Sequence, residues 1–274
     1  MTRSGRASAG LRRLAGLVRQ GGPLLLFGCI FSVAINDAPV TAGFFRPEEV
    51  PAAVVEAAAE GDLALAVRIL YEDERTAWLW APHGWILDSD LQAVARGGRE
   101  SLFVFVDERA RCCRGHFREA AARAEPGPLA DFNRELVRLY RADLAAGRAD
   151  LCARNFRGPA VPKSEVLRFG LTDPRLLANY LAETQALRAV WLSGRDGGAG
   201  FEPVSPEVLW FLTDFDPEAR AAEAAAGDYE EVPLDEMSPE LSQAVCRYAI
   251  AFFSALDRLG DRHAASYWLE RFAP

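Results

Sequence analysis

Residues 102–117 have the sequence Leu-Phe-Val-Phe-Val-Asp-Glu-Arg-Ala-Arg-Cys-Cys-Arg-Gly-His-Phe, and their interpretation decides the fold class. Two apolar segments, 102–106 and 110–117, flank the charged triplet that begins at Asp107. Such a pair of segments around a short charged connection is typical of a β-hairpin. The stretch therefore predicts two antiparallel strands.

Two further pairs of segments support the same interpretation. Residues 64–71 and 76–81 flank a charged segment of a length that suits a hairpin loop. The apolar run 24–35 meets an Asn-Asp-Ala-Pro turn, after which residues 40–45 can return as a second strand. Three expected hairpins predict a largely antiparallel sheet in the first part of the chain.

The pattern changes after residue 118 to the spacing of helices. Apolar side chains recur at three- and four-residue steps between Leu129 and Leu144, and Gly147 stands where such a helix would end. A capping residue, a proline and favourable spacing predict further helices. These are expected over 175–193, after Ser205, after Asp216, over 239–259 following Ser238, and over 261–272. A short helix is also expected at 47–60, in the first part of the chain.

We therefore expect an α+β fold in three parts. A basic amino-terminal segment, 1–22, precedes a mixed, strand-rich region, 23–117, and a helical region, 118–274, packs on or beside the sheet. The last two regions can equally form one integrated domain, because the connection at 124–128 is short.

Composition limits the class of protein. The chain has 274 residues, of which 50% are hydrophobic and 26% charged, as in ordinary globular proteins rather than disordered ones. No apolar run reaches the length of a transmembrane helix. The sequence pI near 5.1 opposes general attraction to nucleic acid. The five cysteines, widely spaced apart from one adjacent pair, do not form a disulfide framework. This favours a cytoplasmic location, where we expect them to be small, mostly buried apolar side chains.

The amino terminus offers an alternative location. Residues 1–36 contain five arginines and no acid, and they include an apolar run followed by small residues. This order is typical of an export signal that would end near residue 34, so an exported or membrane-anchored protein is a further alternative. The competing interpretation is a basic amphipathic helix that leads into a buried strand.

Residues 202–240 form an acidic segment, with twelve acidic side chains against one arginine and a formal charge of −11. This concentration predicts a non-catalytic interaction protein that binds a basic protein partner. The residues expected to contact the partner are Glu230, Glu231, Asp235 and Glu236.

Asp214 and Asp216 offer a second functional hypothesis. They follow an apolar run, and if that run is a strand, both carboxylates point the same way and can hold a divalent metal ion. A metal-dependent hydrolase or transferase would then use Arg195, in a glycine-rich loop, to hold an anion. In the competing interpretation, Asp216 caps the next helix at Pro217.

Two other groups of residues are candidates for chemistry. Cys113 and His116 place a thiol near an imidazole, although on a strand they would point to opposite faces unless a turn intervenes. Three tryptophans in residues 78–85 surround His83 and can stack on a ligand or pack a core. Lys163 is the only lysine, so any mechanism that requires a lysine must use it.

Overall fold

Residues 102–117 do not form a hairpin but lie within one long helix, α5 (Gly98–Ala121). Leu102, Phe103 and Val106 are buried along one side of this helix, which is the spacing of a helical face. The charged triplet at 107–109 contains no glycine or proline, so it continues the helix. The predicted α+β fold with an antiparallel sheet is therefore wrong: the described part of the chain contains helices and no strand.

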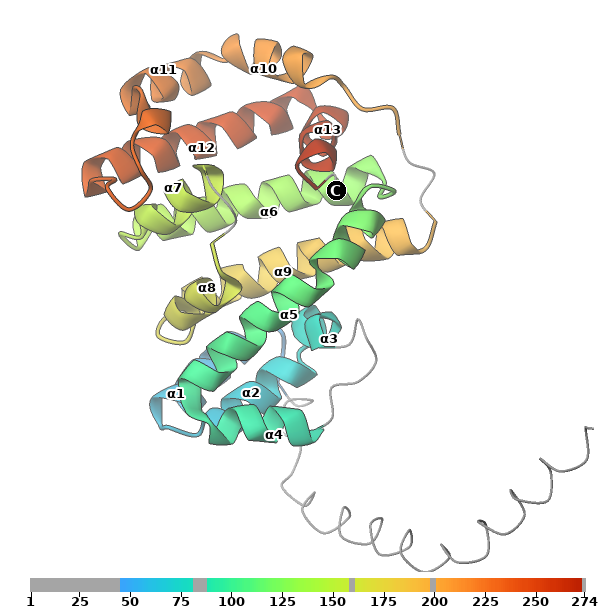
Figure 1. Cartoon of the computed structure of the whole chain (residues 1–274), viewed down its shortest axis with the longest axis vertical. Coiled ribbons are helices and arrows are strands. Elements are labelled where there is room, and N and C mark those ends of the chain that lie inside the picture. The colour runs from blue at the N-terminus through green and yellow to red at the C-terminus, as the bar shows by residue number, and fades with distance from the viewer. Residues whose placement is uncertain (1–44, 81–87, 158–160, 198–200, 273–274) are drawn as a thin grey trace, which may run out of the picture. The chain divides into compact units, whose positions relative to one another are not determined.

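The computed structural model describes residues 45–80, 88–157, 161–197 and 201–272 (Figure 1). They belong to one unit, Ala42–Pro274. The expected hairpin before residue 45, the segment 1–22 and the candidate signal lie outside these ranges. The helices besides α5 are α1 (Val50–Ala59), α2 (Leu63–Glu72), α3 (Glu74–Trp80), α4 (Asp88–Arg96), α6 (Pro126–Ala145), α7 (Ala149–Arg157), α8 (Lys163–Gly170), α9 (Pro174–Arg195), α10 (Pro206–Asp214), α11 (Pro217–Ala226), the 3-10 helix η2 (Tyr229–Glu231), α12 (Pro239–Leu259) and α13 (Asp261–Phe272).

The second predicted hairpin, over residues 64–81, is also helical. The Asp62 side chain caps α2 by accepting a hydrogen bond from the Leu65 N–H at 3.0 Å. The chain then breaks at Asp73, which has extended backbone angles, and α3 begins at the next residue. A continuous apolar run suits a buried helix as well as a strand, and here the cap favours the helix.

The helices predicted for the second half are confirmed. Asp173, Ser205, Asp216 and Ser238 each accept a hydrogen bond from a backbone N–H in the first turn of α9, α10, α11 and α12. Each of these helices has proline in its first positions. The predicted boundary at residues 117 and 118 falls inside α5.

Two hydrophobic cores lie along the described chain, and α5 and α9 contribute to both. The first core contains α1, α2, α4, α8, and the amino-terminal halves of α5 and α9. The second contains α6, α7, α12, α13, and the carboxyl ends of α5 and α9. In Figure 1, α5 runs from the lower group of helices to the upper one, and α9 lies between the two groups. These two helices therefore hold the two cores together.

The two bridging helices approach closely at Gly194. A Cβ atom at this position in α9 would overlap the carbonyl oxygen of Ala120 in α5. Only glycine allows the backbones to come this close without displacement. Gly194 therefore fixes where α5 and α9 cross.

A disulfide bond joins Cys152 in α7 to Cys246 in α12. The expectation from the sequence that the cysteines form no disulfide is therefore wrong for this pair, although both residues are buried. The two residues lie 94 positions apart, and they meet because α7 and α12 pack together, which spacing alone does not reveal. Among the described helices, none is both long enough and apolar enough to cross a membrane.

Candidate functional site

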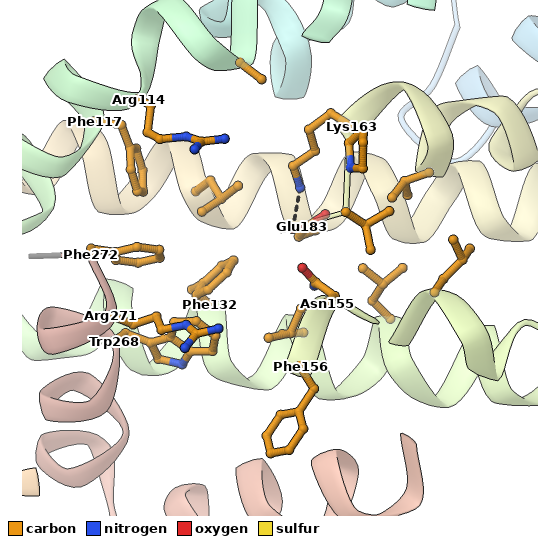
Figure 2. Close-up of a pocket in the computed structure, with 18 of the residues that line it drawn as sticks. Arg114, Phe117, Phe132, Asn155, Phe156, Lys163, Glu183, Trp268, Arg271 and Phe272 are labelled. Atoms are coloured by element: carbon orange, nitrogen blue, oxygen red, sulfur yellow. Dashed lines mark hydrogen bonds and ion pairs between the residues drawn. The ribbon is translucent and has the colours of Figure 1, made fainter. Parts of the chain in front are cut away.

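A cavity of about 1040 Å³ lies where the two cores meet. Its walls come from α5, α6, α7, α9 and α13, with smaller contributions from α3, α8 and α12. The volume is at the upper end of the range for small-molecule pockets, about 300–1,000 Å³. The cavity is therefore large enough for an organic ligand, and its side chains divide into an apolar wall and two polar ends (Figure 2).

The apolar wall is aromatic. Phe132 of α6 packs edge to face on Trp268 of α13, with ring centroids 4.7 Å apart. Phe156 of α7 packs against Phe253 of α12 at 5.7 Å, also edge to face. Trp268 also stacks on Phe272 at 5.5 Å. Because these rings hold one another in place, the wall can receive an apolar or aromatic group without rearranging.

The basic end of the cavity is formed by arginines of α5 and α13. Arg111, Arg114 and Arg118 are spaced by three and four residues, so they lie on one side of α5. Arg271 of α13 also lines the cavity. Figure 2 shows Arg114 and Arg271 on either side of the same space, next to Phe117 and Phe272.

Arg114 and Arg118 have no acidic partner among the described residues. Other arginines in the described chain do pair with acids: Arg154 with Glu165, Arg168 with Glu100, and Arg258 with Asp216, for example. Planar guanidinium groups bind carboxylate, phosphate and sulfonate groups through two parallel hydrogen bonds. The basic end is therefore suited to an anionic group.

The polar end of the cavity contains Lys163, Glu183 and Asn155, which Figure 2 shows away from the arginines. The Lys163 ammonium donates to Glu183 Oε1 at 2.5 Å. Asn155 Nδ2 donates to the Tyr140 hydroxyl at 2.9 Å. The single lysine thus lies in the cavity, but its charge is balanced by a carboxylate.

Asp143 of α6 is a second buried carboxyl group that lines the cavity. Burial, and then the negative charge of Glu183, raise the pKa of Asp143 to about 7, while Arg148 acts in the opposite direction. Near neutral pH this group is therefore partly protonated, so it can donate or accept a hydrogen bond.

A side-chain contact between α5 and α8 positions Lys163. Asp107 Oδ1 accepts a hydrogen bond from the Ser164 N–H at 3.0 Å, and Oδ2 accepts one from the Ser164 hydroxyl at 2.5 Å. Asp107 therefore binds the first turn of α8 from a neighbouring helix. This contact fixes the polar end relative to the arginines on the same helix, α5.

The structure places the predicted metal ligands outside this cavity. Asp216 Oδ1 accepts hydrogen bonds from the N–H groups of Glu218 and Ala219 at 3.1 and 3.0 Å, and Arg258 donates to Oδ2 at 2.6 Å. This is the predicted helix cap. Asp214 is exposed at the end of α10. Within the described ranges, no group of three His, Cys, Asp or Glu residues is arranged to hold a metal ion.

The other predicted candidates do not converge either. His116 is exposed on α5, with Nδ1 3.9 Å from Glu119 Oε2. Cys113 lies on the same helix rather than on a strand, and its side chain is outside the described part, as are His83 and Trp85. Arg195 pairs with Asp196 at 2.7 Å and lies over the Trp191 ring, away from the cavity lining.

The predicted partner-binding residues are all exposed. Glu230, Glu231, Asp235 and Glu236 lie on the connection between α11 and α12. Arg157 holds this connection by donating to the carbonyl oxygens of Glu230 and Val232 at 3.0 and 2.7 Å.

An aromatic patch formed by α10 and by Phe215, the residue directly after it, also belongs to the acidic segment. It consists of large apolar side chains that face solvent, with Phe211 60% and Phe215 67% exposed. The rings of these two residues contact edge to face at 4.8 Å. The remaining members of the patch are Val208 and Trp210.

The sequence interpretation missed the cavity residues. Arg111, Arg114 and Arg118 belong to a recognised arginine-rich stretch, but their common face appears only when that stretch is treated as a helix. No local sequence motif marks Glu183, Asp143 or Asn155 as residues of a site. Comparison of this chain with protein-family models, curated proteins and solved structures finds no match, so a function must be argued from the cavity and the surface themselves.

Proposed function

We propose that the protein binds a small organic anion with an apolar body in the cavity between its two cores. The observation that carries this proposal is the presence of two uncompensated arginines, Arg114 and Arg118, beside an aromatic wall. The anionic group would bind the arginines, and the apolar body would lie against Phe132 and Trp268. This is the usual composition of ligand pockets: a mostly apolar surface with a few well-placed polar groups.

The charges of the lining favour an anion over a cation. Seven basic side chains line the cavity (Arg109, Arg111, Arg114, Arg118, Arg157, Lys163 and Arg271) against three acidic ones (Asp107, Asp143 and Glu183). Asp107 is bound to Ser164, and Glu183 to Lys163. The lining therefore carries more basic than acidic side chains, and two of the basic ones, Arg114 and Arg118, have no acidic partner among the described residues.

Anilinonaphthalene sulfonate tests this proposal, because it combines an aromatic body with one anionic group and fluoresces when bound in apolar surroundings. We expect saturable binding of one molecule per chain, and about tenfold weaker binding to Arg114→Gln/Arg118→Gln, which corresponds to about 1.4 kcal/mol. Arg123→Gln removes an exposed arginine that does not line the cavity and should leave the affinity unchanged.

A second control separates the cavity from the aromatic patch on α10. Phe211→Ser/Phe215→Ser removes exposed rings that could also bind the dye. If the fluorescence is lost in this variant and retained in the arginine variant, the dye binds α10 and the cavity proposal is wrong.

A second candidate function is binding of a basic protein partner through the acidic segment. The aromatic patch favours it, because exposed apolar side chains grouped on one helix are uncommon on surfaces without a partner. A partner with alternating basic and apolar side chains would match both the patch and the surrounding acids. The interaction protein predicted from the sequence thus stays a proposal.

A basic amphipathic peptide of lysine and leucine serves as the probe for this second candidate. Phe211→Ser/Phe215→Ser and the fourfold change of Glu230, Glu231, Asp235 and Glu236 to lysine should each weaken peptide binding in fluorescence anisotropy. If only the fourfold variant does so, the interaction is general charge attraction and the patch is not a docking site. The metal-dependent enzyme remains an untested alternative, against which the cap bonds of Asp216 weigh.

For the location, the disulfide supports export over the cytoplasm predicted from the sequence. Cytosolic thiols are generally kept reduced, whereas a bond such as Cys152–Cys246 persists in oxidising compartments. Expression in cells with and without a disulfide-forming compartment, followed by thiol counting, tests this. Two protected cysteines only in the oxidising compartment would support export; full occupancy in the cytosol would contradict it.

A further inference from the structure

We propose, building on the anion-binding function above, that the ligand also carries a hydroxyl group at the end remote from its anionic group, and that this hydroxyl forms a hydrogen bond with Asp143. The ligand class is then a hydroxylated apolar acid: a rigid apolar or aromatic body with an acidic group at one end and an uncharged hydroxyl at the other. Arg114 and Arg118 fix its orientation, and Asp143 selects the hydroxyl.

Asp143 is a buried carboxyl group without a hydrogen-bond partner in the cavity lining. The residue is only 5% exposed, and it lines the cavity from α6. No described residue donates a hydrogen bond to its carboxyl group, and both oxygens keep accessible surface, unlike Glu183 Oε2, which is sealed off. Buried carboxyl groups are normally hydrogen-bonded, so an accessible one without a partner indicates where a ligand group binds.

The face of α6 that lines the cavity places Asp143 far from the basic end. Side chains at three- and four-residue steps of this helix line the cavity: Phe132, Leu136, Tyr140 and Asp143. Phe132 lies at the basic end, because its ring packs against Phe272, which Figure 2 shows beside the arginines. The eleven positions from Phe132 to Asp143 correspond to a helical rise of about 16 Å. The ligand must therefore be longer than a single ring to reach both groups.

Most of the charges around Asp143 belong to ion pairs. Glu183 of α9 is paired with Lys163 of α8. Arg148 is paired with Asp150 through two hydrogen bonds at 3.0 and 2.9 Å. These two pairs leave little net charge beside Asp143, which favours an uncharged polar group on the ligand over a charged one.

Arg109 of α5 supplies a further positive charge at this end of the cavity. Its guanidinium lies over the Phe105 ring at 5.3 Å, and the side chain lines the cavity beside Lys163. A second anionic group on the ligand, held by Arg109 and Lys163, is therefore the competing interpretation. Probes that carry either a hydroxyl or a carboxylate at this end distinguish the two.

A hydroxyl suits both protonation states of Asp143. Burial, and then the negative charge of Glu183, raise the pKa of Asp143 to about 7, so both states are present near neutral pH. The carboxylate accepts a hydrogen bond from a hydroxyl, and the protonated acid donates one to it. The preference for a hydroxyl should therefore persist between about pH 6 and about pH 8.

Four matched probes test the inference on the wild-type protein by titration calorimetry. They are biphenyl sulfonate and its derivatives with a hydroxyl, a methyl or a carboxylate at the para position of the second ring. We expect the hydroxyl derivative to bind about fivefold more tightly than the methyl derivative at both pH values, as one uncharged hydrogen bond would provide. The carboxylate derivative should bind more weakly than the hydroxyl derivative.

Variants of α6 show whether Asp143 causes the preference. Asp143→Leu should abolish the preference for the hydroxyl, whereas Asp143→Asn, whose amide also donates and accepts, should keep it. Asp131→Leu removes an exposed carboxylate of the same helix that does not line the cavity, and it should also keep the preference. Loss of the preference in Asp131→Leu would contradict the assignment to Asp143.

The outcomes separate this inference from the proposed function. If the sulfonates bind through Arg114 and Arg118 but the hydroxyl adds nothing over the methyl group, the inferred hydroxyl is wrong and the anion site stands. The same holds if the carboxylate derivative binds most tightly. If no probe binds, both proposals are wrong. Because the probes are compared first on the wild-type chain, the result does not depend on whether the variants fold.

Discussion

The cavity and the acidic segment both concentrate charge of one sign, but in different surroundings. The acids at 230–236 project from a surface connection into solvent, where charges are well hydrated. Arg114, which is also exposed, and Arg118, which is half-buried, instead line a space bounded by aromatic rings, without an acidic partner in the described chain. The number of like charges in a region therefore says less about its function than whether those charges line a cavity or lie on a surface connection.

The largest expected effect concerns the disulfide behind the cavity wall. It joins α7 to α12, the helices that contribute Phe156 and Phe253 to the aromatic wall. Cys152→Ser/Cys246→Ser should lower the free energy of unfolding by about 3–5 kcal/mol, because the bond closes a long loop in the unfolded chain. Urea denaturation with and without reductant measures this effect.

The acidic segment should respond differently to the same change. Anion binding in the cavity should weaken on reduction of the disulfide, whereas peptide binding at the α10 patch should weaken less. Equal stability of the wild-type protein in oxidising and reducing buffer would contradict a structural role for the bond.

A slightly smaller effect is expected where α5 and α9 cross. Gly194→Ala would place a methyl group against the Ala120 carbonyl and should lower the free energy of unfolding by about 2–3 kcal/mol. Gly115→Ala is the matched control, because Gly115 also lies in α5 and a Cβ atom there would meet no other atom within 4 Å. We expect it to stabilise the protein by about 0.5–1 kcal/mol. Equal effects at the two positions would show that the crossing is not tight.

The third prediction concerns the pH dependence of the free energy of unfolding, to which a buried carboxyl group and an exposed one should contribute differently. Because the pKa of Asp143 is raised to about 7, the folded protein holds a proton that the unfolded chain releases near pH 4. Stability should therefore fall as the pH rises from about 4 to about 7 and then level off. Asp143→Asn should remove this dependence and raise the free energy of unfolding by about 4 kcal/mol at pH 8, with little change at pH 4.

Asp235→Asn provides the comparison in the acidic segment. It replaces an exposed carboxylate, so the pH dependence of unfolding should stay as in the wild type. Thermal denaturation of the three proteins across this pH range checks both expectations. An unchanged slope in Asp143→Asn would mean that another group is responsible.

The local features of the fold could be predicted from the sequence. The starts of four helices are predictable, because a capping side chain and the proline that follows it act within one turn. The capping residues are Asp173, Ser205, Asp216 and Ser238. The segments 64–81 and 102–117 could not be assigned in the same way. Their apolar runs suit strands and buried helices equally, and only packing against the rest of the chain distinguishes the two.

The candidate site was harder to predict than the fold. Its walls come from helices far apart in the sequence, and Glu183 meets Lys163 only because α8 and α9 pack together. The disulfide depends likewise on the contact between α7 and α12. Asp216, by contrast, could be assigned from local sequence. The sequence allows it to be a metal ligand or a helix cap, and the neighbouring Pro217 favours the cap that the structure shows.

The most direct test of the anion site is the affinity of biphenyl sulfonate for the wild-type chain and for Arg114→Gln/Arg118→Gln, measured side by side by titration calorimetry. The proposed function predicts binding of one molecule per chain and a loss of about tenfold in the double variant. Equal affinities for the two proteins, or no binding to the wild type, would contradict it.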